Sequence, residues 1–263
     1  MKPNVLVVTG FGLNCEKETE AAFRLAGADV TLIHFNDLVE DKTIFQKSQI
    51  LALIGGFSFG DHLGAGTVFA NRLKYNFRNE LLDFIKSDKL IIGICNGFQT
   101  LTRLGLLPGL NKIYMEKQTV ALSWNDNGLF RDDWVNLVAE KKSPCVFTEN
   151  IEKIYLPIRH GEGKFTADEN LINEIERNNL VALRYSDKDG ISTSHFPENP
   201  NGSMNNIAGI CDPTGRIFGL MPHPEAYLSP YNHPHWTRLK ALNQLPKEGE
   251  GLSIFKNAIA YFK

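Results

Sequence analysis

Short apolar runs alternate with stretches of helical periodicity through the first half of the chain. The runs at residues 4–9, 29–34 and 50–54 predict buried strands. Apolar positions three and four apart predict helices over residues 16–26, with Gly27 as the stop, and over residues 78–86. Strands that alternate with helices in this way are typical of a doubly wound α/β fold with a parallel sheet.

The pattern changes in the second half, where strand-like runs follow one another with little helix between them. Residues 181–185, 206–211 and 217–221 predict strands, and Asp-Pro-Thr-Gly at 212–215 predicts a turn that joins the last two as a hairpin. Residues 253–262 predict a closing helix, and residues 227–251 a long surface excursion. We therefore expect a mixed, mostly parallel doubly wound sheet with antiparallel strands added in the second half.

Length, charge and cysteine usage narrow the class of protein. A chain of 263 residues fits one hydrophobic core, so we expect a single domain over residues 1–263. The 28 basic and 30 acidic residues form no basic run, which argues against nucleic acid or an anionic membrane as partner. No apolar stretch approaches the roughly 20 residues of a membrane helix, and the first residues do not resemble a signal peptide. Four dispersed cysteines predict free thiols and a cytoplasmic location: Cys15, Cys95, Cys145 and Cys211.

Residues 90–104 carry the strongest chemical signal in the chain. An apolar run at 90–94 leads into a Gly-x-Cys-x-Gly turn and then a helical pattern, the cysteine counterpart of a nucleophile elbow. Gly93 and Gly97 leave room where the strand and the helix cross. The turn sets Cys95 at a helix N-terminus, where peptide dipoles favour the thiolate. A cysteine that only packs is the alternative, and the two flanking glycines favour a nucleophile.

A thiolate nucleophile needs a base, and the base needs a group that orients it. Two His-x-Glu pairs are candidates, because residues two apart in an extended segment point to the same side. His223 and Glu225 follow the predicted strand at 217–221, and prolines on both sides of His223 restrict the backbone. His160 and Glu162 lie among glycines, as in a mobile loop. Stiffness favours the first pair, but the residues alone leave both open.

A glycine-rich loop, Gly-Gly-Phe-Ser-Phe-Gly-Asp at residues 55–61, follows the predicted strand at 50–54. Open α/β sheets bind ligands at that edge. Small residues there allow backbone N–H groups to approach a developing oxyanion, and the N–H of Asn96 is a second donor. A phosphate-binding loop is the alternative, but it needs Lys and then Ser or Thr where this loop has Asp61.

Two further motifs, and two of the cysteines, do not predict a binding or catalytic site. Gly-x-Gly at residues 10–12 begins like a dinucleotide fingerprint, but Cys15 replaces the third small residue and no acidic residue ends the second strand. His233 and His235 have no third ligand at zinc spacing, so we predict no metal site. Cys145 and Cys211 lie in a loop and a strand without partners, and we expect them to be inert.

Taken in order, three motifs resemble those of class I glutamine amidotransferases: G-I-C-N-G-F-Q around Cys95, G-G-F-S-F-G-D at 55–61 and P-H-P-E at 222–225. More narrowly, the chain is similar to the glutaminase subunits of phosphoribosylformylglycinamidine synthase. Asn96, R-H-G-E-G at 159–163 and N-P-N-G-S at 199–203 carry that narrower match. The similarity spans nearly the whole chain.

The resemblance implies a triad of Cys95, His223 and Glu225, which decides between the two His-x-Glu pairs. It implies glutamine as substrate, a γ-glutamyl thioester on Cys95, and ammonia delivered to an ATP-using synthetase subunit that converts formylglycinamide ribonucleotide to the amidine. It also implies oxyanion or substrate-binding residues and residues that support them: Gly56, Phe57, Asn96 and Gln99 in the first group, and His160, Glu162 and Asn201 in the second.

No cofactor is expected on this chain, because ATP and magnesium would bind the synthetase subunit. Some segments, among them the Pro- and His-rich stretch near 227–236, resemble the glutaminase end of the fused, large synthase more than the compact separate subunit. The form of synthetase that it docks on, and whether a small third subunit bridges the two, stay open. A stand-alone cysteine amidase and a non-catalytic binding protein on the same fold are the alternative functions.

Overall fold

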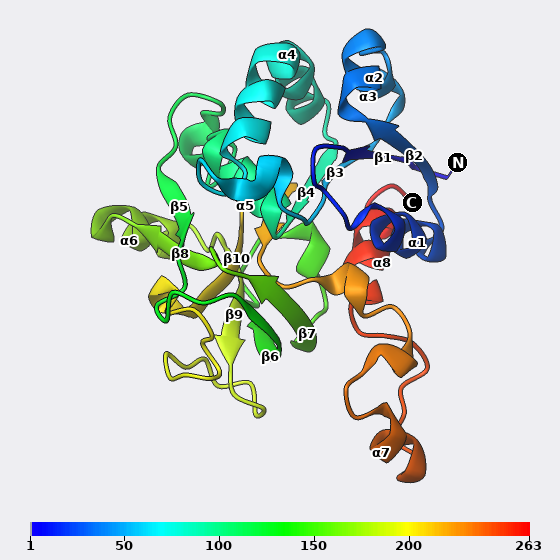
Figure 1. Cartoon of the computed structure of the whole chain (residues 1–263), viewed down its shortest axis with the longest axis vertical. Coiled ribbons are helices and arrows are strands. Elements are labelled where there is room, and N and C mark those ends of the chain that lie inside the picture. The colour runs from blue at the N-terminus through cyan, green and yellow to red at the C-terminus, as the bar shows by residue number, and fades with distance from the viewer. Residues whose placement is uncertain (1) are drawn as a thin grey trace.

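Nine strands form one sheet in the computed structural model of the chain, which describes residues 2–263. Their order across the sheet is β2-β1-β3-β4-β11-β10-β9-β6-β7 (Figure 1). A separate two-stranded sheet pairs β5 with β8. The strands have these bounds: β1 Asn4–Thr9, β2 Asp29–His34, β3 Ile50–Leu53, β4 Leu90–Ile94, β5 Val120–Ser123, β6 Arg131–Ala139, β7 Lys153–His160, β8 Lys164–Ala167, β9 Val181–Ser186, β10 Ile207–Cys211 and β11 Ile217–Leu220.

Parallel and antiparallel strands occupy different parts of the large sheet. Strands β2, β1, β3, β4 and β11 pair in parallel. Strands β10, β9, β6 and β7 continue the sheet in antiparallel pairs, and β10 and β11 form the predicted hairpin. The predicted fold class, a doubly wound α/β sheet with antiparallel strands from the second half, is confirmed.

Helices cover both faces of the parallel strands. Helix α1 connects β1 to β2, whereas α4 connects β3 to β4 in the opposite direction along the sheet, so right-handed crossovers place the two helices on opposite faces. Helix α8 returns to α1, where Phe255 packs edge-on against Phe23 at 4.9 Å. The helices have these bounds: α1 Glu16–Ala26, α2 Phe35–Glu40, α3 Ile44–Lys47, α4 Thr67–Lys86, α5 Asn96–Arg103, α6 Glu169–Arg177, α7 Trp236–Ala241 and α8 Leu252–Ala260.

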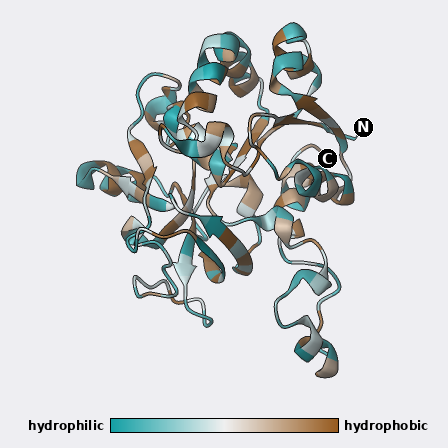
Figure 2. Ribbon diagram, viewed as in Figure 1, coloured by the Kyte–Doolittle hydropathy of each residue, from teal (hydrophilic) through white to brown (hydrophobic). Residues whose placement is uncertain are grey.

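The centre of the parallel sheet is buried on both faces. Every residue of β3, β4 and β11 is buried, which matches their continuous apolar sequences. Hydrophobic residues accordingly gather along the central strands, while the outer sides of the helices are polar (Figure 2). No helix within residues 2–263 is long and apolar enough to cross a membrane. The carboxyl ends of β3, β4 and β11 thus lie in a rigid, well-packed frame.

The predicted excursion leaves this frame as an extended arm. Figure 1 shows α7 near its tip, away from the sheet. Tyr231 and Leu242 on the arm are more than half exposed. At its base, Tyr227 is buried against Trp134 at 5.2 Å between ring centroids, so the arm is anchored where it leaves the sheet.

The structure contains elements that the hydrophobic pattern did not reveal. Helix α4 begins at Thr67, eleven residues before the predicted start, and its backbone is kinked at Phe77. Strands β5 to β8 and helix α6 fill the middle of the chain, where no element was predicted. The first three strands and α1 lie where they were predicted, to within one residue.

Candidate active site

Cys95 lies at the sharp turn between β4 and α5. Its φ of 51° and ψ of −105° are strained for a residue other than glycine. A Cβ at Gly97 would overlap the carbonyl of Leu53, and one at Gly93 would lie 2.5 Å from Leu101. Both glycines are therefore required by the close crossing of strand and helix, as predicted. The turn leaves the Cys95 thiol at the first turn of α5, and only 5% of the residue is exposed.

His223 reaches Cys95 from the neighbouring strand. In the β4–β11 pairing Leu220 lies opposite Ile94, and the Leu220 carbonyl accepts the N–H of Cys95 at 2.8 Å. The chain then turns, so that Nδ1 of His223 lies 2.6 Å from Oε1 of Glu225, with both residues 2% exposed. Burial alone would lower the pKa of His223, but the Glu225 carboxylate and the Cys95 and Cys15 thiols together raise it well above its usual value. The arrangement is that of a base, oriented by a carboxylate, beside a thiol.

Cys15 brings a second thiol to the same place. Its Sγ, a nitrogen of His223 and an oxygen of Glu225 all lie within 4.8 Å of one another. Burial raises the pKa of the Cys15 thiol, although the nearby His223 acts in the opposite direction. Within residues 2–263 no other three His, Cys, Asp or Glu side chains form such a group, and His233 and His235 belong to none.

The glycine-rich loop after β3 approaches the turn that follows β1. Gly56 has a φ of 138°, and a Cβ there would lie 2.7 Å from the Gly12 carbonyl oxygen, so only glycine fits. The N–H of Phe57 donates to that same oxygen at 3.0 Å. Phe57 was predicted near the oxyanion hole, but this bond occupies its backbone donor. Among the described residues no acceptor faces the N–H of Gly56 or Asn96, which leaves these two free to bind an oxyanion.

Gln99 was predicted to bind substrate, and in the structure each end of its side-chain amide makes a hydrogen bond within the chain. Its Nε2 donates to the Glu162 carbonyl at 2.6 Å, and its Oε1 accepts from Nδ2 of Asn96 at 3.1 Å. Asn96 also donates to Asp61 at 3.3 Å. These bonds link α5 to the turn at residues 160–163, and each end of the amide keeps one further hydrogen-bonding position.

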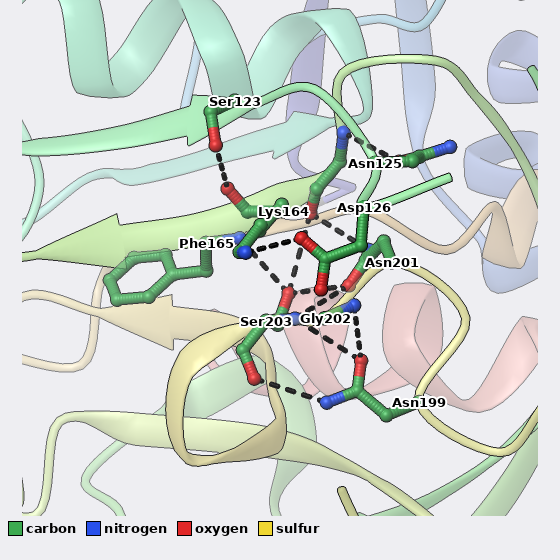
Figure 3. A network of polar contacts seen from close by, with 10 residues as sticks. Ser123, Asn125, Asp126, Lys164, Phe165, Asn199, Asn201, Gly202 and Ser203 are labelled. Atoms are coloured by element: carbon green, nitrogen blue, oxygen red, sulfur yellow. Dashed lines mark hydrogen bonds and ion pairs between the residues drawn. The ribbon is translucent and has the colours of Figure 1, made fainter. Parts of the chain in front are cut away.

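That turn is fixed by asparagines. Nδ1 of His160 lies 3.0 Å from Oδ1 of Asn125, whereas Glu162 accepts the N–H of Ala65 at 3.1 Å, so His160 and Glu162 do not form a pair. Asn201 donates to the Gly163 carbonyl at 2.9 Å and accepts from Ser203 (Figure 3). Burial, with the charge of nearby His223, lowers the pKa of His160 to about 3, so its imidazole is neutral at physiological pH.

The structure therefore gathers Cys95, His223 and Glu225 into one buried group, and places Gly56 and Asn96 with free N–H donors beside it. Residues that sequence reasoning missed are Cys15, Asn125 and Asp61. Burial and the charge of Glu162 raise the pKa of Asp61 to about 6. Asp61 belongs to the glycine-rich loop at residues 55–61, which was identified from the sequence. No sequence signal, however, predicts the contact of Cys15 with His223 or that of Asn125 with His160.

Comparison with known proteins agrees with this geometry. A sequence model of the CobB/CobQ-like glutamine amidotransferase domain matches residues 2–262. A protein of Methanococcus maripaludis named phosphoribosylformylglycinamidine synthase subunit PurQ is 44% identical over 267 residues, covering 99% of this chain and 97% of that protein. A PurQ subunit of Dehalococcoides mccartyi is 42% identical over 260 residues, covering 99% and 98%.

Solved structures extend the comparison. A chain in the structure of PurLQS from Thermotoga maritima superposes with a TM-score of 0.72 at 30% identity, and the match covers all of both chains. A glutamine amidotransferase from the same organism, at 16% identity and a TM-score of 0.56, shares the fold. The full-length PurQ relatives and the family match over residues 2–262 lead to one conclusion. The chain belongs to the CobB/CobQ-like glutamine amidotransferase family, among the PurQ subunits of phosphoribosylformylglycinamidine synthase.

Proposed function

We propose that the chain is the glutaminase subunit of a phosphoribosylformylglycinamidine synthase, and that Cys95 is its nucleophile. One observation carries the proposal: a strained elbow cysteine lies beside a histidine whose other nitrogen is 2.6 Å from a buried glutamate. This grouping suits attack on an amide carbon. Because the chain belongs to the glutamine amidotransferase family, we take this amide to be the side chain of glutamine.

In this mechanism His223 moves the protons. Its Nε2 takes the proton of the Cys95 thiol, and the thiolate attacks the side-chain amide carbon of glutamine. The C–N bond then breaks, His223 returns the proton to the leaving nitrogen, and ammonia and a thioester form. Water attacks the thioester carbon and gives its proton to His223, the C–S bond breaks, His223 returns the proton to the Cys95 sulfur, and glutamate leaves. Glu225 orients the imidazole and stabilises its charged form.

The negative oxygen of each tetrahedral intermediate needs hydrogen-bond donors. The free N–H groups of Gly56 and Asn96 supply them. A third donor, the N–H of Phe57, becomes available when its bond to Gly12 opens. Because the loop is strained at Phe59 and Asp61, with φ of 58° and 56°, we propose that it changes conformation when the partner docks.

Ammonia must reach an acceptor before it escapes, so the partner should cover the site. The proposed partner is the synthetase subunit, to which we assign ATP and magnesium, and we propose that the assembly includes a small third subunit, since a chain like this one occurs in the solved PurLQS structure. We further propose that the assembly works in the cytoplasm, where the four free cysteines stay reduced.

An exposed apolar group beside the site is the proposed docking surface. This mouth patch consists of Phe57, Trp124, Leu129 and Phe130, which are between 45% and 66% exposed. Phe57 belongs to the glycine-rich loop and lies 6.0 Å from Phe130 between ring centroids. Trp124 lies against Gly161 in the turn that holds His160. A partner seated on the patch would therefore contact both segments that border Cys95.

The proposal is tested by covalent labelling. A glutamine analogue with a reactive diazoketone should modify Cys95 in the full-length chain, as located by mass spectrometry of peptides. The Cys95→Ser variant should resist, and Cys145→Ser, which removes another buried thiol, should label like the unmodified chain. No labelling of Cys95, with or without the synthetase subunit, would leave the non-catalytic binding protein as the better function. Rapid glutamine hydrolysis without a partner would favour the stand-alone amidase.

A further inference from the structure

The catalytic grouping holds more ligand atoms than glutamine hydrolysis uses. Cys15 Sγ joins His223 and Glu225 in a group whose ligand atoms are all within 4.8 Å of one another. Oε2 of Glu225 is buried without a hydrogen-bond partner, and so is Nε2 of His223, the atom that takes the Cys95 proton in the proposed mechanism. Both side chains are at least nine-tenths buried, whereas Cys15 is partly exposed and gives access from solvent. Cys15 has no part in the proton transfers of the proposed reaction.

Gly55 packs closely against both the Cys15 thiol and the His223 imidazole. A Cβ at Gly55 would lie 2.8 Å from Cε1 of His223 and 3.1 Å from Sγ of Cys15. Because Gly55 has no side chain, the thiol and the imidazole can both approach its backbone this closely. The group of Cys15, His223 and Glu225 offers a sulfur, an imidazole nitrogen and a carboxylate oxygen, which are ligand types that zinc binds.

The spacing suits a tetrahedral ion. Zinc–ligand bonds of about 2.0–2.3 Å put neighbouring ligand atoms roughly 3.3–3.8 Å apart. The ligand atoms of this group all lie within 4.8 Å of one another, so small side-chain movements bring them to that spacing. Three protein ligands leave the fourth position to water. Hard cations such as Mg²⁺ prefer oxygen ligands only and are poorly matched.

We propose that Cys15, His223 and Glu225 form a binding site for a thiophilic divalent cation such as Zn²⁺, and that its occupation blocks glutamine hydrolysis. On binding, the Cys15 thiol gives up its proton to solvent, and the imidazole lone pair goes to the metal. His223 can then no longer accept the proton of Cys95. The inhibition rests on the proposed function, but the binding does not.

A serine at position 15 tests the site without threatening the fold. Cys15 is the N-cap of α1, and its side chain makes no capping hydrogen bond there. Serine is among the preferred N-cap residues and has nearly the same shape, but its hydroxyl is a poor zinc ligand. The matched control is Cys145→Ser, because that thiol lies on a separate cavity beside Tyr261. A second control, His235→Ala, removes one of two arm imidazoles whose centroids are 5.9 Å apart.

The experiment measures metal binding directly on the full-length chain. Zinc affinity comes from competition with a chromophoric chelator, and Co²⁺ reports sulfur ligation through its thiolate charge-transfer absorption. Cys15→Ser should weaken zinc binding at least about tenfold, since even residues that only support a ligand cost that much. It should also abolish the cobalt–thiolate band, whereas the two controls should keep both properties. Inhibition is measured relative to each variant's own glutaminase rate in the presence of chelator. The zinc concentration that gives half inhibition should rise in Cys15→Ser by the same factor as its zinc affinity falls.

Three results would overturn the proposal. Cys15→Ser could bind zinc as tightly as the unmodified chain, the affinity could fall in Cys145→Ser or His235→Ala instead, or bound Co²⁺ could lack the thiolate band. A chain that binds zinc through Cys15 but never hydrolyses glutamine would keep the metal site and reject the proposed function. The two failures are thus distinguishable.

Discussion

Asn125 holds the imidazole of His160: its Oδ1 lies 3.0 Å from Nδ1, and the ring is buried and neutral. The other His-x-Glu pair is built differently, with the carboxylate of Glu225 itself on the ring of His223. A neutral, amide-bound histidine in a fixed turn supports its surroundings, whereas one paired with a carboxylate can cycle between neutral and charged forms. The two His-x-Glu pairs therefore have the same spacing in the sequence but different hydrogen-bond partners in the structure.

We predict that His223→Ala slows acylation of Cys95 by about a hundred- to ten-thousandfold, the usual contribution of a general base. His160→Ala should change turnover or coupling to the synthetase more than acylation, because its ring bonds to Asn125. Single-turnover thioester formation, followed by quenched flow, separates the two steps. Normal acylation in His223→Ala with none in His160→Ala would reverse the assignment.

Cys95→Ser should remove glutamine-dependent amidine synthesis by the reconstituted complex and leave ammonia-dependent synthesis intact. In the proposed mechanism the elbow cysteine only liberates ammonia, and serine fits the same turn. The complex is assayed first with glutamine and then with an ammonium salt. If both activities vanished in a variant that still assembled, Cys95 would not be a dedicated glutaminase nucleophile.

Asp61→Asn should stabilise the chain most at neutral pH. Burial and the charge of Glu162 raise the pKa of Asp61 to about 6, so the folded state binds the proton more tightly than the unfolded chain does. The ionised carboxylate is therefore unfavourable above that pKa, and the cost disappears as the pH falls toward the ordinary value. The gain in melting temperature from Asn should shrink below the pKa of about 6.

Asp41→Asn is the control with the opposite sign. Hydrogen bonds from the hydroxyl and backbone of Thr43 lower the pKa of Asp41, so its ionised form favours folding. Replacement by Asn should lower the melting temperature, and more at neutral pH than in acid. Equal shifts for Asp61→Asn at all pH values would show that neither burial nor Glu162 raises the pKa of Asp61.

Docking of the synthetase should speed glutamine hydrolysis by roughly a hundred- to a thousandfold, which is the factor by which the rate falls when one oxyanion donor is removed. In the free chain the N–H of Phe57 is bound to Gly12, and it must turn to join the other donors. Glutaminase rates are compared with and without the partner, its ATP and its ribonucleotide substrate. Equal rates in every condition would reject a gated subunit.

Phe130→Asp should weaken binding of the synthetase at least about tenfold, because a charge would be buried at the centre of the proposed contact. Tyr75→Asp places the same charge at another exposed aromatic position, on α4, and should leave the affinity unchanged. Titration by light scattering or calorimetry measures both. A loss of affinity in the Tyr75 variant alone would move the docking surface away from the mouth patch. The arm at residues 227–236 remains a second predicted reporter of partner contact.

Much of the fold could be predicted from apolar runs and from residues that end helices. Continuous apolar runs marked β1 and β4, and Gly27 ends α1 with the left-handed backbone that a glycine allows. Strand β6 was missed because its first residues are charged, with Asp132 and Asp133 exposed, so no apolar run announces it. The start of α4 was missed because its N-cap, Gly66, supplies no side-chain cap to read.

The site was predictable to the extent that its residues follow strands. Cys95 and His223 come directly after apolar runs whose carboxyl ends meet at one sheet edge. Cys15 and Asn125 could not be assigned, since their contacts with His223 and His160 join segments that are remote in sequence. The hydrogen bonds of Phe57 and Gln99 are equally a matter of tertiary geometry, and they decide which predicted donors are free.

The position of β11 in the sheet has a consequence for biosynthesis. This strand is made near the end of the chain, yet it inserts between β4 and β10, and its Leu220 carbonyl completes the turn at Cys95. On the ribosome, the edge of β4 therefore stays unpaired until residues 217–220 have emerged. A nascent chain holds its nucleophile long before it holds its base. The proposed nucleophile and base can therefore meet only after β11 and the residues that follow it have been synthesised.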